Sequence, residues 1–409
     1  MKVFKFGGAS IKDAPSIKNI LEIISKYEKD NLVIVVSAMG KTTNALEKVV
    51  DSYFNDKAQL QSSISDIFNF HINILNNLFE KNHFIFSELN TSFEKLSSFI
   101  KSNKSPSYSF VYDQVVSLGE LISSKIIYEY LLKNNMDCSL IDARNCIKTN
   151  SKYRGGKVQW DMTNKKIKEL ISDSKINITQ GFIGSDSNNF TVTLGREGSD
   201  YSAAIFAYSL NAESLSIWKD VPGLLNADPK FFSNTKLLNQ ISYSETIELA
   251  FYGASIIHPK TLQPLQKKEI PLFVKSFKNP LSNGTVISKG VDINENFANY
   301  WLHNGMLNLS GKKMSKSDGN VKLLNEYIDE YGGDVVRFFF LRAHYRSPQE
   351  FSEQLLEETK KTLSNLAEFT KDVVAEPNDD DTVDIFIKCM NDDMNTPKFL
   401  GEIFERIKD

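Results

Sequence analysis

The chain has 409 residues, 41% of them hydrophobic and 24% charged, and a formal net charge of −3. This length and composition predict a soluble globular protein of two or three domains, and the near-neutral charge argues against nucleic-acid binding through bulk positive charge. Three cysteines without a CxxC pair indicate neither a disulfide framework nor a thiolate zinc site. With no signal-peptide pattern and no run of ~18 apolar residues, we expect a cytoplasmic protein that does not contact membranes.

The first predicted element is a short strand, VFKF, which ends at Gly7 and Gly8 and leads into a helix with apolar residues at helical spacing. A strand, a glycine turn and a helix in this order point backbone N–H groups at the space above the strand end. With Lys5 beside these groups, the turn suits a phosphate. The same residues could equally form a plain tight turn with a solvated lysine.

A run of β-branched residues, LVIVVS at 32–37, predicts a strand that is buried on both faces of a parallel sheet. The Gly40-Lys41-Thr42 segment that follows is not a P-loop, because Val35 stands where that motif needs its first glycine. At this strand end, Thr43 could bind a ligand or cap the next helix.

Residues 45–127 are mostly helical in pattern, and SLGELISSKIIYEYLL at 117–132 predicts a helix with Glu120 near its start. An acid at that position complements the helix dipole, so the sequence alone does not indicate a ligand role for Glu120.

The segment 178–204 places a glycine-bearing turn, Arg196, Ser199 and Asp200 between an apolar run and an alanine-rich helix start. Open α/β sheets bind anionic ligands at such points. Strands and helices alternate up to residue 288 and predict a three-layer α/β domain with a mainly parallel central sheet.

Beyond about residue 290 the pattern changes to a mostly α-helical segment. Ser347-Pro348-Gln349-Glu350 has the form of a capping box with proline at the first helical position, which predicts the start of a helix. The acidic stretch AEPNDDD at 375–381 predicts a linker. We therefore expect three parts: 1–289, 290–374, and an acidic linker with the start of a further helical region at 375–409.

Seven segments in order resemble the catalytic domain of aspartate kinase, of the amino-acid kinase superfamily. They are KFGGAS (5–10), SAMGKTTN (37–44), SLGE (117–120), ITQGFIG (178–184), LGREGSDYSAA (194–204), IWKDVPGLLNADPK (217–230) and FYGASIIHPKTL (251–262). The resemblance implies the amino-acid-kinase fold for residues 1–289. It also implies Mg²⁺-dependent transfer of the ATP γ-phosphoryl group to the β-carboxylate of L-aspartate, giving 4-phospho-L-aspartate for lysine, threonine and methionine biosynthesis.

The resemblance also implies roles for individual residues. The implied catalytic residues are Lys5 and Asp200, and the implied substrate-binding residues are Thr43, Glu120, Phe182, Arg196 and Ser199. The implied ATP-binding residues are Gly7, Gly8, Ser10, Lys219, Asp220, Leu225 and Lys230. No protein motif indicates a metal-ligand set.

Four positions depart from that family's usual pattern. Ala9 replaces a threonine, Glu197 stands where a glycine or another small residue is more common, and Leu225 and Ser255 stand where some members have tyrosine and lysine. These departures bear on ATP affinity rather than on the reaction. Lys219 could serve the pocket from which the usual lysine is absent.

Three later segments resemble the later part of cysteinyl-tRNA synthetase: FANYWLHNGMLNLSGKKMSKSDGNV (297–321), GGDVVRFFFLRAHYRSP (332–348) and MNDDMNTPKFLGEIFE (390–405). In class I synthetases, the loop formed here by Lys313, Met314, Ser315, Lys316 and Ser317 stabilises the pyrophosphate of ATP. The sequence has no HIGH motif and no counterpart of that family's zinc ligands. We therefore expect no independent aminoacylation, and a chimera, a misjoined product or a remnant with weak tRNA contact stay open.

Two further expectations follow from the resemblance. The segments after residue 290 do not resemble the regulatory domains of aspartate kinases, which predicts insensitivity to lysine and threonine and leaves the oligomeric state open, with a dimer as one option. A rival is a related kinase for glutamate, carbamate or a nucleotide, but the arginine of GREGSD and the HPKTL segment favour aspartate.

Overall fold

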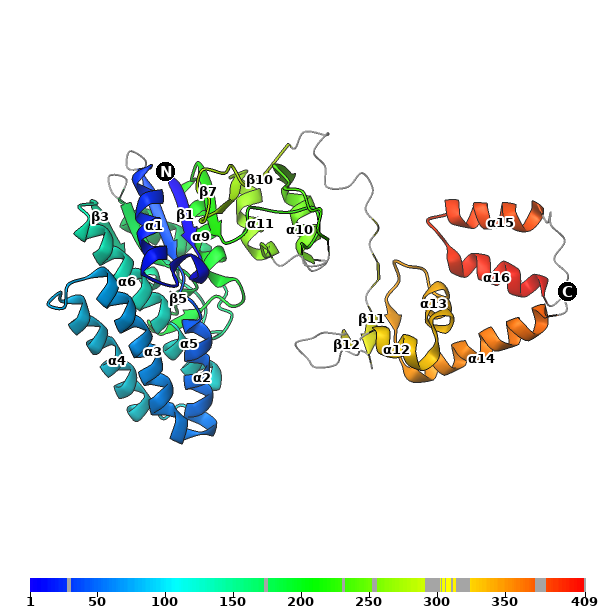
Figure 1. The fold of residues 1–409 in the computed structure, drawn as a ribbon, viewed down its shortest axis with the longest axis horizontal. Helices are drawn as coiled ribbons and strands as arrows, with labels where there is room; N and C mark the ends of the chain where they lie inside the picture. The colour runs from blue at the N-terminus through cyan, green and yellow to red at the C-terminus, as the bar shows by residue number, and fades with distance from the viewer. Residues whose placement is uncertain are drawn as a thin grey trace. The chain divides into compact units, whose positions relative to one another are not determined.

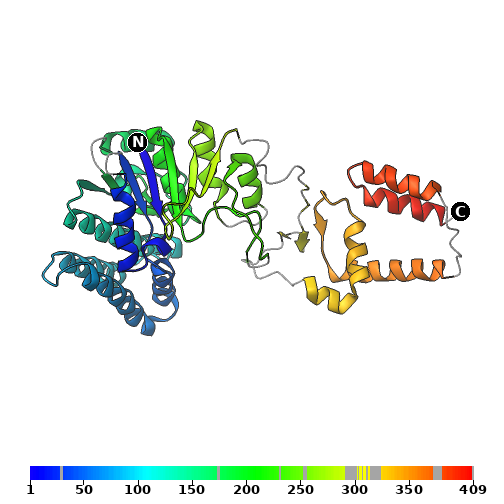
Figure 2. The same ribbon diagram turned by 45° about the horizontal axis from the view of Figure 1, so that its top comes forward.

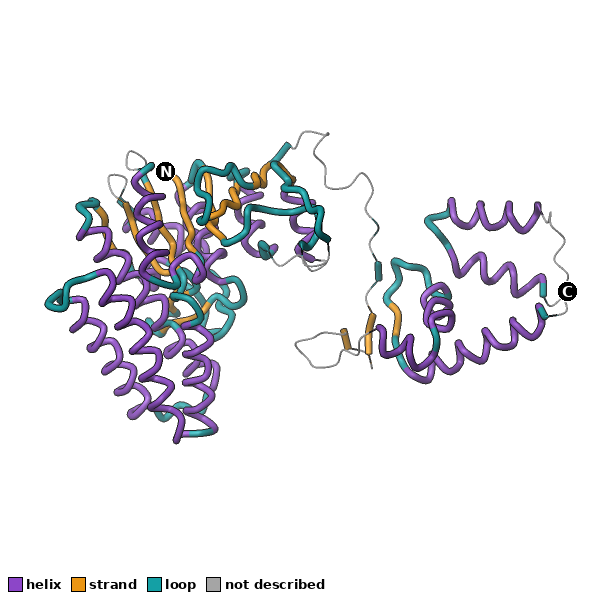
Figure 3. Tube along the Cα trace, viewed as in Figure 1, coloured by secondary structure: helices purple, strands orange, loops and turns teal. Residues whose placement is uncertain are grey.

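The computed structural model describes residues 1–27, 31–172, 176–229, 232–251, 256–290, 302, 304–305, 307–309, 312–313, 324–371 and 380–407. The chain divides into two compact units, Met1–Phe297 and Ala298–Asp409. Figure 3 distinguishes the helices and strands of both. The three-part division at residues 290 and 375 stays a prediction.

A sheet forms the centre of the first unit (Figure 1). It has eight strands. All neighbouring strands pair in parallel except β9 and β10, which are antiparallel. The predicted three-layer α/β fold with a mainly parallel sheet is confirmed. In sheet order, the strands are β3 (Cys138–Ile141), β4 (Ile176–Gln180), β2 (Leu32–Val36), β1 (Lys2–Phe6), β7 (Ser214–Lys219), β9 (Leu272–Ser276), β10 (Thr285–Ser288) and β8 (Gln240–Ser242).

Helices cover both faces of this sheet, because the central strands are apolar on both sides. Every residue of β2 is buried: Ile34 packs into one hydrophobic cluster, whereas Val33 packs into another. Helix α1 and the bundle of α2 to α6 cover the first face, and α8, α9 and α11 cover the second (Figures 1 and 2). The helices are η1 (Gly8–Ile11), α1 (Ala14–Ser25), α2 (Thr42–Asn55), α3 (Lys57–Leu78), α4 (Ile85–Ser102), α5 (Tyr108–Val116), α6 (Leu118–Lys133), α7 (Ala143–Cys146), α8 (Trp160–Leu170), α9 (Gly198–Leu210), α10 (Tyr243–Phe251) and α11 (Pro259–Lys268).

A small hairpin of β5 (Ile183–Ser185) and β6 (Thr191–Thr193) lies between β4 and α9 in the chain. Helix α5 holds it from the side: the Gln114 amide donates to the backbone oxygen of Thr191 at 2.8 Å and accepts from its N–H at 3.2 Å. At Thr191 of β6, the Gln114 side chain therefore makes the two bonds that a neighbouring strand would make.

The second unit contains a small three-stranded sheet in the order β12–β11–β13 and five helices among its described residues. Its hydrophobic core is formed by Tyr327, Val336, Phe339, Phe351 and Leu356. The elements are β11 (Leu307–Leu309), β12 (Lys312–Lys313), β13 (Gln349–Glu350), α12 (Leu324–Tyr331), α13 (Gly333–Leu341), α14 (Glu353–Thr370), α15 (Asp380–Asn391) and α16 (Thr396–Arg406).

The helix predicted to start at Ser347 starts later. Gln349 and Glu350 form the short strand β13, which pairs in parallel with β11, and α14 begins at Glu353. Ser352 is the N-cap, and its hydroxyl accepts a hydrogen bond from the N–H of Leu355 at 3.2 Å. Pairing with β11 thus outweighed the local capping pattern.

Among the residues that the structure describes, none of the helices has the length and apolar character needed to span a membrane.

Candidate active site

A cavity of about 560 Å³ lies at the carboxyl ends of the parallel strands, where η1, the start of α2, the start of α6 and the start of α9 meet. All seven residues predicted as catalytic or substrate-binding line it: Lys5, Thr43, Glu120, Phe182, Arg196, Ser199 and Asp200. The structure therefore brings together side chains from five segments that are far apart in the chain. Their individual roles stay predictions.

Two lysines hold the carboxylate of Asp200, which lies in the first turn of α9 and is completely buried. Lys5 Nζ on β1 lies 2.6 Å from one oxygen and Lys219 Nζ at the end of β7 lies 3.3 Å from the other. Burial alone would raise the pKa of Asp200, but the two ammonium groups outweigh it and lower the pKa. Asp200 is therefore ionised at neutral pH and fixes both lysines.

The position of Lys219 follows from the pairing of β1 with β7. Lys5 and Ile217 are register partners, so Lys219 extends two residues beyond the level of Lys5 and its side chain turns back towards Asp200. Its ammonium group also donates to the backbone oxygen of Ile256, just before α11. Lys219 therefore links β7, α9 and the segment that precedes α11.

Glu120 lies in the first turn of α6 with its carboxyl group fully buried. One oxygen accepts a hydrogen bond from the N–H of Ala38 at 3.2 Å, and the other has no hydrogen-bond partner among the described residues. Burial raises the pKa of Glu120 to about 8, although the Ala38 N–H and the charge of Lys5 act in the opposite direction. A buried oxygen without a donor is a ready acceptor for a ligand N–H group.

Three non-glycine residues with left-handed backbone border the cavity. Arg154 has φ 63°, Phe182 has φ 69° and Glu197 has φ 54°, conformations that cost of order 1–3 kcal/mol each. The Phe182 N–H donates to the Ser202 hydroxyl at 2.9 Å, which holds the strained turn. The left-handed conformation at 197 also explains why glycine is more common there in the family that the sequence resembles.

The glycine turn after β1 approaches the turn after β2 very closely. A Cβ atom on Gly8 would lie 2.8 Å from the backbone oxygens of both Ala38 and Gly40, and the Gly40 N–H donates to the Gly8 oxygen at 3.0 Å. Only glycine fits at position 8 without a backbone shift.

The predicted ATP-binding residues are only partly gathered at the cavity. Gly8 lines it, and Gly7 lies near Lys5. The hydroxyl of Ser10 donates to the backbone oxygen of Trp218 at 3.0 Å and so connects η1 with β7. Asp220 is exposed and Leu225 forms a backbone bridge with Leu237; neither lines the cavity.

Some predicted residues lie outside the described parts of the chain. They are Lys230 of the nucleotide segment and Met314, Ser315, Lys316 and Ser317 of the synthetase-like loop, and Lys313 is described only by its backbone in β12.

The sequence reasoning missed a second arginine in the cavity. Arg154 lines it, with its guanidinium carbon 4.5 Å from the centre of the Tyr112 ring. The buried carboxylate of Asp113 accepts from the Arg154 N–H at 3.0 Å and from the Thr193 N–H at 2.9 Å, which fixes this side of the cavity. The only signal in the sequence is an arginine before two glycines in a polar loop, at 154–156.

Residues 1–276 match the model of the amino acid kinase family, which is more than half of the chain. The chain belongs to the amino acid kinase family. Residues 282–361, beyond the amino acid kinase region, match the model of the catalytic domain of class I (C) tRNA synthetases. Both resemblances found in the sequence are thus confirmed at the level of these families.

Curated relatives of this amino acid kinase include lysine-sensitive aspartokinase 3 of Escherichia coli, which is 32% identical over 70% of this chain and 63% of its own length. The bifunctional aspartokinase/homoserine dehydrogenase of Buchnera aphidicola is 29% identical over 79% of this chain and 43% of its own length. The chain thus spans less than two thirds of either relative.

Solved structures of aspartokinases have the same fold. Aspartokinase III of Escherichia coli in complex with aspartate and ADP superposes with a TM-score of 0.67, at 30% identity, over 72% of this chain and 65% of that chain. The Clostridium acetobutylicum aspartate kinase gives a TM-score of 0.58 at 28% identity, over 70% of this chain and 62% of that chain.

Proposed function

We propose that residues 1–289 form an aspartate kinase that transfers the γ-phosphoryl group of ATP to the β-carboxylate of L-aspartate. The observation that carries this proposal is the cavity in which Lys5 and the buried Asp200 lie with Arg196 and Glu120. Lys219, which is partly buried and does not line the cavity, pairs with the second oxygen of Asp200. The aspartate and ADP in the related Escherichia coli structure support the same substrate pair.

Phosphoryl transfer needs positioning and charge stabilisation more than covalent chemistry. The ammonium groups of Lys5 and Lys219 would neutralise negative charge on the transferring group. Because Asp200 is bonded to both, it would hold them in place before the substrates bind. Its lowered pKa suits this positioning role and does not suit a proton acceptor.

Arg196 and Glu120 would bind the amino acid substrate. Arg196 is exposed and lines the cavity. Its guanidinium group would bind a substrate carboxylate through two parallel hydrogen bonds. The unpartnered oxygen of Glu120 would accept a hydrogen bond from the substrate ammonium group. That positive charge would favour the ionised form of Glu120.

Mg²⁺ is expected to arrive with ATP rather than in a protein cage. Within the described residues, no group of three or more His, Cys, Asp or Glu side chains could hold a metal ion, and both oxygens of Asp200 face lysines. Mg²⁺ commonly binds through substrate phosphates and few carboxylates, which is compatible with this cavity.

The test is release of ADP by the full chain with L-aspartate, ATP and Mg²⁺, compared with an Asp200→Ala variant. We expect turnover that Asp200→Ala abolishes and that Lys165→Ala, a change in an exposed ion pair, leaves unchanged. Wild-type activity no higher than that of Asp200→Ala would refute the proposal. Glutamate, carbamate and nucleotide acceptors in the same assay would reveal the rival substrate classes.

For the second unit we propose weak tRNA contact at most, fused to the kinase in a chimeric or misjoined chain. The match of residues 282–361 to a synthetase catalytic domain supports this proposal. A salt-dependent shift of tRNA on a gel would support the contact, since phosphate binding weakens as salt rises; no shift at low salt would contradict it.

A further inference from the structure

A second cavity, of about 660 Å³, lies between α4 and α6 and reaches the ends of β3 and β4. We call the cavity around Asp200, described above, the substrate cavity. No residue lines both it and the second cavity, so the two are separate. None of the residues assigned to the proposed phosphoryl transfer lines the second cavity. Its size is in the range of small-molecule sites.

Helices α4 and α6 both contribute apolar side chains to the lining of the second cavity. Leu89 and Leu96 of α4 face Leu118, Leu121 and Ile122 of α6 across it. Leu118 and Leu121 are only half-buried, although the helix around them is largely buried. These side chains leave hydrocarbon surface that an apolar ligand would cover.

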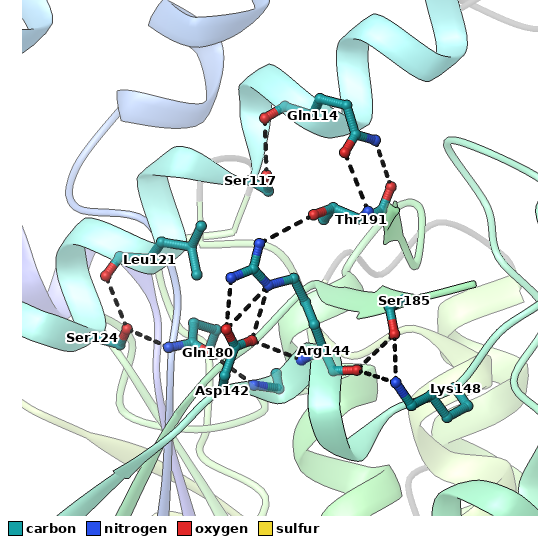
Figure 4. A network of polar contacts seen from close by, with 11 residues as sticks. Gln114, Ser117, Leu121, Ser124, Asp142, Arg144, Lys148, Gln180, Ser185 and Thr191 are labelled. Atoms are coloured by element: carbon teal, nitrogen blue, oxygen red, sulfur yellow. Dashed lines mark hydrogen bonds and ion pairs between the residues drawn. The ribbon is translucent and has the colours of Figure 1, made fainter. Parts of the chain in front are cut away.

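The end of the cavity is polar, and Figure 4 shows its network. Arg144 binds Asp142 with Nη2 at 2.6 Å and with Nε at 3.0 and 3.2 Å, whereas Nη1 has only a 3.4 Å contact with the Thr191 hydroxyl. Thr191 is fixed in turn by the amide of Gln114. The guanidinium group is thus held in one orientation with N–H groups left over.

Asp142 has little accepting capacity left for a ligand. Both oxygens accept from the Arg144 side chain, and Oδ1 also accepts the Arg144 backbone N–H at 3.0 Å as the N-cap of α7. A ligand ammonium group would therefore compete with bonds already made. The arginine, in contrast, retains donors for a carboxylate.

The charges that line the cavity favour an anion. Three cations, Lys95, Lys125 and Arg144, stand against two acids, Glu88 and Asp142. Lys125 pairs with Glu88 at 2.6 Å and Arg144 pairs with Asp142, which leaves the charge of Lys95 in excess at the lip of the cavity.

We propose that the second cavity binds a small organic carboxylate with an apolar body. The carboxylate accepts hydrogen bonds from Nη1 of Arg144, and the hydrocarbon part lies between Leu89 and Leu121. The site is distinct from the proposed aspartate site and does not depend on it.

Titration calorimetry of the full chain tests this site with three probes that share one hydrocarbon: phenylpropanoate, phenylpropanol and phenylpropylamine. We expect the carboxylate to bind more tightly than the alcohol by about tenfold, the equivalent of one charge-assisted hydrogen bond at a partly exposed arginine, and the amine to bind more weakly than both. Equal binding of carboxylate and alcohol, or no heat up to the solubility limit, would overturn the proposal.

Variants locate the binding and are checked for folding by circular dichroism. Arg144→Gln should weaken phenylpropanoate binding by about tenfold. Leu121→Glu, which puts an acid among the apolar side chains without touching the arginine, should weaken it at least as much. Lys165→Gln, an exposed charge loss elsewhere, should have no effect. Arg196→Gln distinguishes the two cavities as binding sites for phenylpropanoate. An unchanged affinity for this probe supports binding in the second cavity, whereas a lost affinity places the probe in the substrate cavity and refutes the proposal. Because heat is measured, absence of kinase activity would not affect the result.

Discussion

Replacing Glu120 by glutamine should remove most of the stability loss that this buried carboxyl group causes as the pH rises from 4.5 to about 8. Burial raises the pKa of Glu120 from 4.5 to about 8, so the folded chain holds a proton that the unfolded chain releases between these values. Stability from this group is therefore fully present below pH 4.5, falls as the pH rises towards 8, and is constant above it. The interval corresponds to at most roughly 5 kcal/mol for a fully buried group.

Glutamine is close in shape to protonated glutamic acid and keeps an oxygen for the Ala38 N–H. Urea unfolding of the wild type and Glu120→Gln between pH 5 and pH 9 measures the difference, with Glu22→Gln, at an exposed glutamate of α1, as the matched control. We expect Glu120→Gln to gain stability relative to the wild type as the pH rises, and Glu22→Gln to follow the wild type. A constant difference between the wild type and Glu120→Gln across this range would refute the reasoning.

Three further changes test other parts of the structure. Lys219→Met should lower kcat by about a hundredfold in the ADP-release assay, since it removes one of the two cations that we propose to neutralise the transferring group; Lys165→Met is the control, and an unchanged kcat would contradict the proposed role. Gly8→Ala should lower the free energy of unfolding by about 1–3 kcal/mol, because its Cβ would meet two backbone oxygens at 2.8 Å; a wild-type urea midpoint would contradict this. Burial lowers the pKa of His71 from 6.5 to about 4, so its stability contribution is present above pH 6.5 and lost as the pH falls towards 4. His71→Phe should reduce the loss of unfolding free energy between pH 6.5 and pH 4 by roughly 3 kcal/mol. The same loss in the variant and the wild type, measured by urea unfolding, would show that His71 is not its cause.

Periodicity and turn residues were enough to predict the α/β layers of the first unit. The apolar run at 32–37 identified a strand buried on both faces, and β2 is buried throughout. The capping pattern at Ser347 failed because it is local, whereas Gln349 and Glu350 pair with β11 about forty residues earlier in the chain. A local pattern does not report such a partner.

The cavity residues could be found where they occur in short motifs, and not where the fold alone brings them together. Arg154 lies in the cavity because its backbone N–H binds Asp113 on α5, a contact that no spacing predicts. The second cavity could not be predicted for the same reason, since α4, α6 and Arg144 come together only in the folded chain. The bond from Lys219 to the segment before α11 is likewise a tertiary contact.

The hairpin of β5 and β6 has a consequence for the order of folding. A two-stranded hairpin is marginal on its own. In this one, the N–H groups of Thr191 and Thr193 donate to the side chains of Gln114 and Asp113, which lie 77 and 80 residues earlier in the chain. Closing such long loops costs entropy before the bonds form. We therefore expect this side of the substrate cavity to take its final shape only once α5 has docked against the hairpin.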